Sequence, residues 1–136
     1  MLNANRPVPV PDESTEGFWE AARRGVLALQ HCPACGNYQH PPQPICLKCH
    51  ATALEFAPVS GEGVVYSWTV MHERRVAGFE DAAPYTVVVV RLAEQPDLHL
   101  VTNWPAEAPP PALDQPVAVT FERLDDTISL PQFRPR

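Results

Sequence analysis

Two Cys-x-x-Cys motifs constrain this sequence more than any other feature. Cys32 and Cys35 form the first motif, Cys46 and Cys49 form the second, and ten residues separate the two pairs. Each motif can form a tight turn whose backbone amides point at the sulfurs, and a linking hairpin can bring both turns to one tetrahedral ion. Four thiolates saturate zinc and leave no position open for water or substrate. We therefore predict one structural zinc ion that takes no part in catalysis.

The residues around the cysteines leave alternatives to this zinc site. An iron centre of the rubredoxin type could use the same ligands, although nothing else in the sequence indicates electron transfer. Two disulfides are a weaker alternative. His31, His40 and His50 flank the cysteines and could replace one thiolate, but four cysteines in register make that unnecessary. Gly36 suits the positive φ that closes the first turn, whereas His50 follows the second pair, so we expect that turn to close in another way.

The composition predicts a mainly β protein. Seventeen of the 136 residues are proline, which lacks a backbone donor and fixes φ, so long helices are disfavoured. The apolar fraction of 45% and the charged fraction of 19% lie near globular averages. A chain of this length can form one compact unit with an appended ribbon, but not two full-sized cores.

The charge and the apolar pattern argue against two classes of partner, nucleic acid and membranes. The formal net charge is −6, and Lys48 is the single lysine beside nine arginines, so the chain is a poor match for the phosphates of nucleic acid. No apolar run reaches the length of a signal peptide or of a membrane span. We therefore expect a cytoplasmic protein without membrane contact, in which reduced thiolates hold a metal.

The amino-terminal region predicts an extended arm and a short helix. Alternate prolines in residues 1–13 favour an extended arm, and such arms often lie across a partner. In the next segment Ser14 or Thr15 can cap a helix of about ten residues that Gly25 ends.

Two aromatic residues, Phe18 and Trp19, give the predicted helix an apolar face. Phe18 lies four residues before Ala22 and beside Trp19, so this face can dock on apolar surface. The favoured interpretation is that both aromatic residues pack on the chain's own ribbon or barrel. The alternative is that they dock a partner.

The remaining sequence predicts short strands. Residues 26–31 form a strand that leads into the first cysteine pair. Five further candidates are rich in β-branched and aromatic residues and are separated by turn signals: residues 64–72, 85–92, 98–104, 117–124 and 128–133. The run TVVVV indicates a strand that is buried on both faces. Five strands without a long intervening helix favour a Greek-key barrel of the OB-fold type. We divide the chain into an arm and helix (1–30), a zinc ribbon (31–58) and an OB-fold (59–136).

The sequence has no convincing catalytic motif, because glycine-rich phosphate loops, His-Glu-x-x-His and paired carboxylates on a helix are all missing. The most polar cluster follows the first barrel strand and contains His72, Arg74 and Arg75. Its arginines could contact the phosphates of a nucleotide or coenzyme A. A solvated loop is the favoured alternative.

The order of the features resembles the family long labelled domain of unknown function 35. The resemblance rests on FWEAARRGVLALQHCPACG, HPPQPICLKC, GEGVVYSWTV, PYTVVVVRL, LVTNW and PVAVTFERLDDTISLPQFRP, and it covers residues 15–135. It implies a rubredoxin-like zinc ribbon behind an amino-terminal helix, followed by an OB-fold. Asp114 departs from the family pattern, in which a glycine is expected before PVAV. This departure leaves only the conformation of the turn at Asp114 in question.

The resemblance also implies a role. Members of this family accompany thiolase-like or hydratase-like enzymes that act on acyl-coenzyme A esters, so it implies a non-catalytic subunit of a hetero-oligomer. The expected partner is a thiolase-fold subunit of the sterol-carrier-protein type, as in steroid side-chain aldolases, and the alternative partner is a hydratase-like protein. The arm and residues 72–84 are candidate contacts, and no catalytic residue carries over. Two other functions stay open: a stand-alone acyl-coenzyme A-binding module and an OB-fold nucleic-acid-binding protein.

Overall fold

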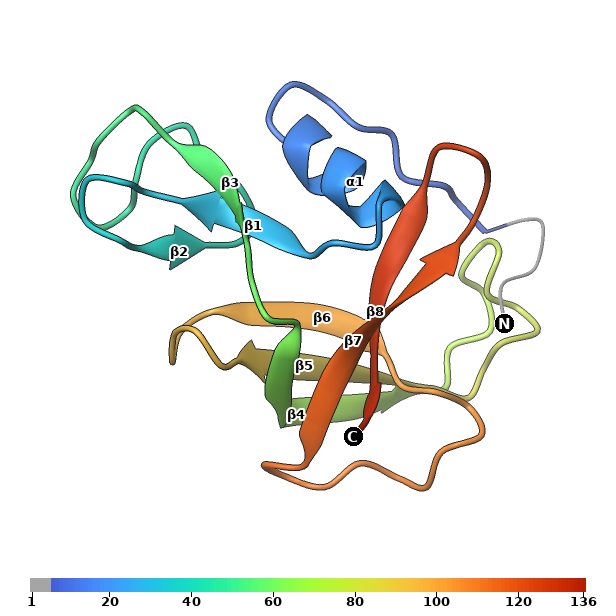
Figure 1. Cartoon of the computed structure of the whole chain (residues 1–136). Coiled ribbons are helices and arrows are strands. Elements are labelled where there is room, and N and C mark those ends of the chain that lie inside the picture. Colours follow the sequence, from blue (N-terminus) through green and yellow to red (C-terminus); the bar gives the residue numbers. More distant parts are fainter. Residues whose placement is uncertain (1–5) are drawn as a thin grey trace.

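The computed structural model describes residues 6–136, so the first five residues of the predicted arm lie outside the described part. One short helix and eight strands make up the described chain (Figure 1). Their bounds are α1 (Glu16–Arg23), β1 (Ala28–His31), β2 (Tyr38–Gln39), β3 (Glu55–Pro58), β4 (Glu62–Met71), β5 (Tyr85–Leu92), β6 (His99–Asn103), β7 (Pro116–Arg123) and β8 (Ser129–Pro135). The prediction of a mainly β protein with a short amino-terminal helix is confirmed.

The start of α1 differs from its prediction. Neither Ser14 nor Thr15 caps the helix with its side chain, and the helix has eight residues. Asp12 instead accepts the backbone N–H groups of Ser14 and Thr15 at 2.9 and 3.0 Å, and its own N–H donates to Thr15 Oγ1 at 3.0 Å. This reciprocal pattern is that of a capping box shifted toward the amino terminus, so the cap falls on the turn before α1. Gly25 ends the helix with a φ of 76°, as predicted.

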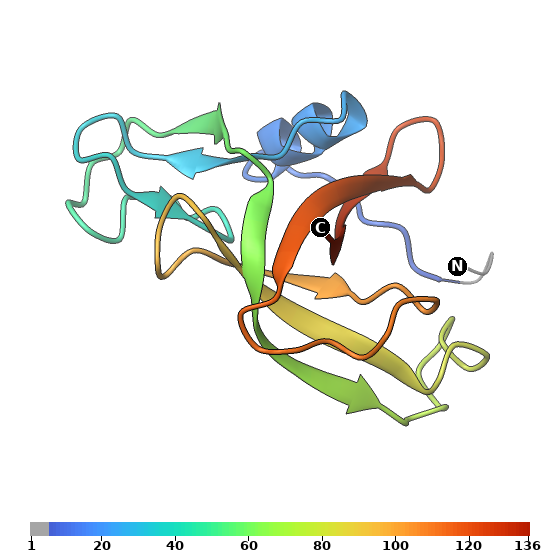
Figure 2. The same ribbon diagram turned by 60° about the horizontal axis from the view of Figure 1, so that its bottom comes forward.

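The zinc ribbon is a small antiparallel sheet in the order β2-β1-β3. β1 lies in its centre, and its register with β3 runs from Ala28 opposite Pro58 to His31 opposite Glu55. The ribbon and α1 lie together on one side of the barrel, and the chain enters β4 directly after β3 (Figures 1 and 2). Because β1 begins only five residues after α1, the helix is held close to the ribbon.

The five remaining strands form an OB-type barrel in the order β6-β5-β4-β7-β8. β4 is the central strand, and a bulge between Val65 and Ser67 bends it. Such a bulge raises the local twist that a closed sheet requires. The two outer strands, β6 and β8, meet without a backbone ladder and complete the barrel. The sequence-predicted OB-fold is confirmed.

A single apolar core joins the helix, the ribbon and the barrel. Phe18 and Leu29 belong to the same buried cluster as barrel residues such as Phe133. The prediction that the valine run is buried on both faces is wrong. Val88 and Val90 are fully buried, whereas the alternate valines are half-buried, because the outer face of a barrel strand faces solvent.

The turn before β7 keeps the conformation that the family pattern implies. Asp114 has a φ of 61°, a left-handed conformation that aspartate tolerates better than most residues. Its N–H donates to the carbonyl of Val65 at 2.9 Å, and its carboxylate lies 3.7 Å from the guanidinium of Arg91. The missing glycine therefore leaves this turn intact.

Candidate functional site: a zinc centre and an open barrel end

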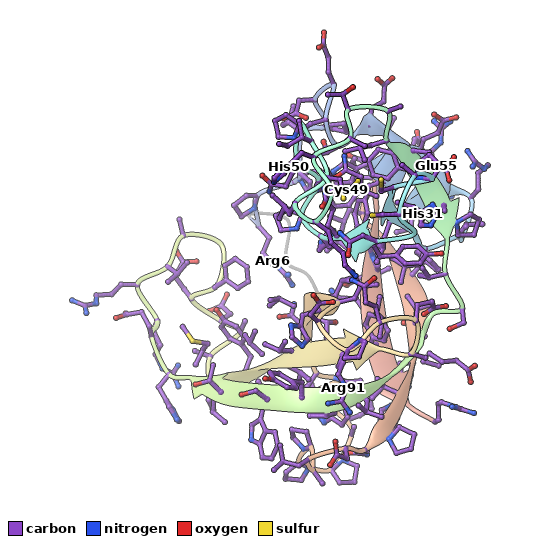
Figure 3. All side chains as sticks on the ribbon, turned by 90° about the vertical axis from the view of Figure 1, so that its left-hand side faces the viewer. Arg6, His31, Cys49, His50, Glu55 and Arg91 are labelled. Atoms are coloured by element: carbon purple, nitrogen blue, oxygen red, sulfur yellow. The ribbon has the colours of Figure 1, made fainter. Side chains whose placement is uncertain are left out.

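The four cysteines converge on one point. All four Sγ atoms lie within 4.8 Å of one another, and two pairs are 3.6 Å apart, Cys32 with Cys49 and Cys35 with Cys46. A tetrahedral zinc ion with Zn–S bonds of about 2.3 Å sets its sulfurs about 3.8 Å apart. Cys32 and Cys46 are buried and the other two are exposed. Figure 3 shows the sulfurs gathered beside the labelled Cys49.

Both turns of the ribbon close in the same way. The N–H of Gly36 donates to the carbonyl of Cys32 at 2.7 Å, and the N–H of His50 donates to the carbonyl of Cys46 at 2.9 Å. Gly36 has a φ of 82° and His50 a φ of 64°. The expectation that the second turn closes differently is therefore wrong, because an exposed histidine can occupy the left-handed region at a moderate cost.

The pKa values of the cysteines favour a bound cation at the centre of the cluster. Backbone N–H groups of Cys49 and Lys48 lower the pKa of Cys46 to about 6. In Cys49 the N–H of Ala51 lowers the pKa, but neighbouring sulfurs, Cys32 first among them, and burial outweigh it and raise the pKa to about 12. The sulfurs therefore share protons, because Cys46 is favoured as a thiolate and Cys49 as a thiol that donates to it. A bound divalent cation would take the place of those protons and let all four cysteines bind as thiolates.

The flanking histidines have other contacts. His31 Nδ1 lies 2.8 Å from a carboxylate oxygen of Glu55, and the two labelled side chains lie side by side in Figure 3. The ring of His40 stacks on Phe18 with centroids 5.3 Å apart, and burial lowers its pKa. His50 is exposed. Within residues 6–136, the metal-ligand cluster consists of cysteines alone.

Two buried glutamines support the second cysteine pair, and the sequence analysis missed them. Gln30 accepts the N–H of Gln43 at 2.8 Å and donates to its carbonyl at 2.9 Å. Gln39 accepts the N–H of Leu47 at 2.9 Å and donates to the carbonyl of Ile45 at 3.0 Å. A third bond of 2.7 Å joins the two glutamines. The sequence feature that could have identified them is a polar residue at a strand position whose side chain points into the ribbon. The loop between the cysteine pairs has backbone groups there that need hydrogen-bond partners.

The predicted polar cluster after β4 is exposed. Arg75 forms a bidentate ion pair with Glu73 through two contacts of 2.9 and 2.8 Å. This contact lowers the pKa of Glu73 to about 2. Arg74 and His72 are exposed, and within the described chain Arg74 has no ion-pair partner. Contact of His72, Arg74 and Arg75 with coenzyme A phosphates or with a partner stays a prediction.

The barrel is open at the end where this loop lies. A pocket of about 670 Å³ occupies that end. Trp68 and Val70 line it and leave 39% and 44% of their surface exposed. The guanidinium carbon of Arg6 lies 4.6 Å from the ring centroid of Phe79, and both residues line the pocket. Two segments that the sequence singled out, the arm and residues 72–84, therefore meet at one place.

Phe18 and Trp19 belong to the side of the molecule that holds the ribbon. Phe18 is 8% exposed and lies in the shared core, whereas Trp19 is half-buried against that core. Their rings contact edge to face with centroids 4.9 Å apart. Phe18 thus packs within its own chain, as the favoured interpretation held. Docking of a partner through the exposed part of Trp19 stays a prediction.

A four-thiolate ribbon behind a short helix, joined to a five-stranded barrel, defines a zinc-ribbon OB-fold protein. Two family models match the chain: the ChsH2 rubredoxin-like zinc ribbon domain over residues 19–55 and the ChsH2 C-terminal OB-fold domain over residues 57–122. The chain belongs to the ChsH2 family of DUF35 proteins. The ribbon match and the sulfur geometry together confirm the prediction of one structural zinc ion.

Comparison with individual proteins agrees with this assignment. The solved structure titled Ltp2-ChsH2(DUF35) aldolase matches with a TM-score of 0.81 and 34% identity, over 94% of this chain and 98% of that chain. A probable enoyl-CoA hydratase alpha subunit of Thermomonospora curvata is 35% identical over 133 residues, which is 97% of this chain and 40% of that protein. A DUF35 domain-containing scaffold protein of Methanocaldococcus jannaschii is 38% identical over 72 residues, which is 52% of this chain and 50% of that protein. The chain thus spans half or less of these two relatives.

No helix in the described part of the chain is both long and apolar enough to span a membrane.

Proposed function

We propose that this chain is a non-catalytic subunit that docks on a thiolase-fold enzyme and completes an aldolase acting on acyl-coenzyme A esters. The observation that carries the proposal is a structural match to a chain of the Ltp2-ChsH2(DUF35) aldolase. The match covers 98% of that chain. The name of the archaeal relative, a scaffold protein, agrees with a supporting role. The cysteine cluster supports it too, because four thiolates leave the metal no open position for substrate. Reduced thiolates fit a complex in the cytoplasm.

The open barrel end is the docking surface in this proposal. Trp68 and Val70 belong to the inward-facing row of β4, yet both stay substantially exposed. Large apolar side chains in such a place mark interaction sites. Arg6 and Phe79 add contacts from two other segments to the same pocket. A protruding apolar segment of the thiolase-fold subunit is the occupant that this surface suits, since aromatic residues in a pocket dominate binding energy at interfaces.

The direct test mixes the purified chain with a thiolase-fold subunit of the Ltp2 type. We expect one hetero-oligomer in size-exclusion chromatography with light scattering, and aldol cleavage of a β-hydroxyacyl-coenzyme A ester only in the mixture. A chain that neither binds this subunit nor changes its activity would contradict the proposal. Binding of an enoyl-coenzyme A hydratase subunit instead would contradict the aldolase proposal. The partner would then be hydratase-like, as the name of the Thermomonospora relative indicates.

A matched pair of variants tests the docking surface. Trp68→Ala removes an aromatic side chain from the pocket, and we expect the affinity for the partner to fall at least about tenfold. Tyr66→Ala removes an aromatic side chain that is 50% exposed on the same strand and lies outside the pocket. Its affinity should stay within about threefold of the parent chain. Equal effects of the two substitutions would place the docking surface elsewhere.

A second candidate function is binding of acyl-coenzyme A by the isolated chain, and the exposed Arg74 favours it. Its guanidinium has no ion-pair partner among the described residues and can meet a phosphate. Calorimetry of the purified chain with coenzyme A tests this function without any enzyme. Binding that Arg74→Ala abolishes would support it, and the absence of heat would exclude it.

A further inference from the structure

The turn between β5 and β6 is bonded to the zinc ribbon by one side chain, that of Gln95. Its Oε1 accepts the backbone N–H of Tyr38 at 3.0 Å, and its Nε2 donates to the carbonyl of the same residue at 2.7 Å. Gln95 therefore pairs with β2 as a strand residue would. The two residues are 57 positions apart, so this contact joins the barrel to the ribbon.

Asn37 extends the contact to the metal site. Its Oδ1 lies 3.2 Å from Gln95 Nε2, and its Nδ2 donates to the sulfur of Cys46 at 3.8 Å. The carbonyl of Asn37 accepts the N–H of Cys32 at 2.8 Å, so the first cysteine turn itself fixes the position of this side chain. Gln95 Nε2 has a third acceptor in Asp97 Oδ1 at 2.7 Å, so its two hydrogens are shared among three acceptors and the contact with Asn37 is the longest. A series of polar contacts thus connects a zinc-ligand sulfur through Asn37 to Gln95.

The barrel side of the series ends in the core. The carbonyl of Gln95 accepts the N–H of Leu98 at 3.2 Å, and the carbonyl of Leu98 accepts the N–H of Leu92 at 2.9 Å. Leu98 is 1% exposed and belongs to the shared apolar cluster. A shift of Gln95 therefore moves a core residue, and the core of a protein is too densely packed to absorb such a shift freely.

We propose that Asn37 and Gln95 form a relay that couples zinc binding to the position of the β5–β6 turn. A metal-bound thiolate is a fixed, negatively charged acceptor for the Asn37 amide. Loss of the metal frees the sulfur, so the amide loses its charged partner and keeps the contact of its Nδ2 with Gln39 Oε1 at 3.4 Å, which orients its oxygen less firmly toward Gln95. Coupling is reciprocal, hence a weakened relay also weakens zinc binding. The relay is a property of the isolated chain and does not rest on the proposed function.

Amide exchange measured by NMR on the whole chain tests the relay directly. In the parent chain, removal of zinc by a chelator should speed exchange at Leu92 and Leu98 at least about fivefold. In zinc-loaded Gln95→Ala these two amides should already exchange at the faster rate, and chelation should change them no further. Gln115→Ala is the matched control, because the side chain of Gln115 bonds within the loop before β7, to the N–H of Ala112, and it should respond to zinc as the parent chain does.

A second variant and a second measurement keep the test independent of folding defects in the barrel. Asn37→Ala leaves every barrel residue unchanged. Gln95→Glu keeps an acceptor for the N–H of Tyr38 but removes the donor to Asn37, together with the donors to the Tyr38 carbonyl and to Asp97. Both should weaken zinc binding about fivefold or more in a competition titration with a chromophoric chelator. Unchanged zinc affinity in both variants would overturn the relay. So would equal acceleration of all barrel amides in the parent chain and in Gln95→Ala, because the coupling would then run through the shared apolar core.

Discussion

Gln132 closes the barrel by accepting the hydroxyl of Thr102 at 2.7 Å. The same Gln132 oxygen accepts the N–H of Asn103 at 3.1 Å, and the Thr102 hydroxyl accepts the N–H of Phe133 at 3.2 Å. β6 and β8 share no backbone ladder, so these side chains satisfy backbone groups that an open edge would leave unpaired. The closure lies beside the pocket, which Gln132 also lines.

Removal of this closure should destabilise the barrel. Gln132→Ala leaves the N–H of Asn103 without its acceptor, which costs about 1–3 kcal/mol for a buried group. Urea unfolding followed by tryptophan fluorescence should show this loss. Thr69→Ala, at an exposed position of β4, should stay within about 0.5 kcal/mol of the parent chain. Equal stability of the two variants would contradict a role for Gln132 in closure.

The cysteine cluster should hold one zinc ion per chain, and the ribbon should depend on it. Cys46→Ser removes a buried sulfur ligand, so zinc measured by mass spectrometry should fall far below one equivalent. Because zinc binding and ribbon folding are linked, the near-ultraviolet circular dichroism and the melting temperature should fall with it. A metal-free chain with undiminished stability would disprove a structural role for zinc.

His50 should be dispensable for zinc binding. Its φ of 64° suits glycine, and a left-handed residue with a Cβ costs about 1–2 kcal/mol. Glycine recovers part of that cost but is more flexible in the unfolded chain. His50→Gly should therefore keep one zinc equivalent, with stability within about 1 kcal/mol of the parent chain. Loss of zinc in this variant would indicate that His50 is a zinc ligand.

The ion pair of Glu73 and Arg75 predicts an acid-side titration. The side-chain hydrogen bond from Arg75 lowers the pKa of Glu73 from 4.5 to about 2. A lowered pKa means that the stabilisation is present above pH 4.5 and is lost as the pH falls through about 2. Carbon-detected NMR of the Glu73 carboxyl group should give a midpoint near the lower value.

The two neighbouring arginines supply the control for this titration. Arg75→Ala should return the midpoint of Glu73 toward 4.5. Arg74→Ala should leave it in place, since only the backbone N–H of Arg74 contacts that carboxylate. A parent-chain midpoint at 4.5 would show that the ion pair does not persist in solution.

Gly63 should resist substitution for a steric reason. A Cβ at this position would lie 2.5 Å from the carbonyl oxygen of Arg91 and 2.9 Å from a methyl group of Val90. Gly63 pairs with both neighbouring strands, so its backbone has little room to move away. Gly63→Ala should cost about 1–3 kcal/mol in urea unfolding. Ser67→Ala, at an exposed position of the same strand, should show no comparable loss.

The sequence alone determined the features that depend on neighbours along the chain. The spacing of Cys32, Cys35, Cys46 and Cys49 predicted the zinc ribbon, because two tight turns on one hairpin form four ligands wherever the rest of the chain goes. The five barrel strands appear within two residues of their predicted bounds, since their β-branched runs end at turn residues. The ribbon strands β2 and β3 had no such signal and were missed.

Only the tertiary structure decided which distant residues meet. Gln95 and Tyr38 are 57 residues apart, and Thr102 and Gln132 are 30 apart. Neither pair has a signature in composition or spacing. Arg6 likewise meets Phe79 only because the arm crosses the open end of the barrel. Such contacts depend on strand register and on how the ribbon sits against the barrel. The shared core fixes both, because burial of apolar surface favours one arrangement of the whole chain over local alternatives.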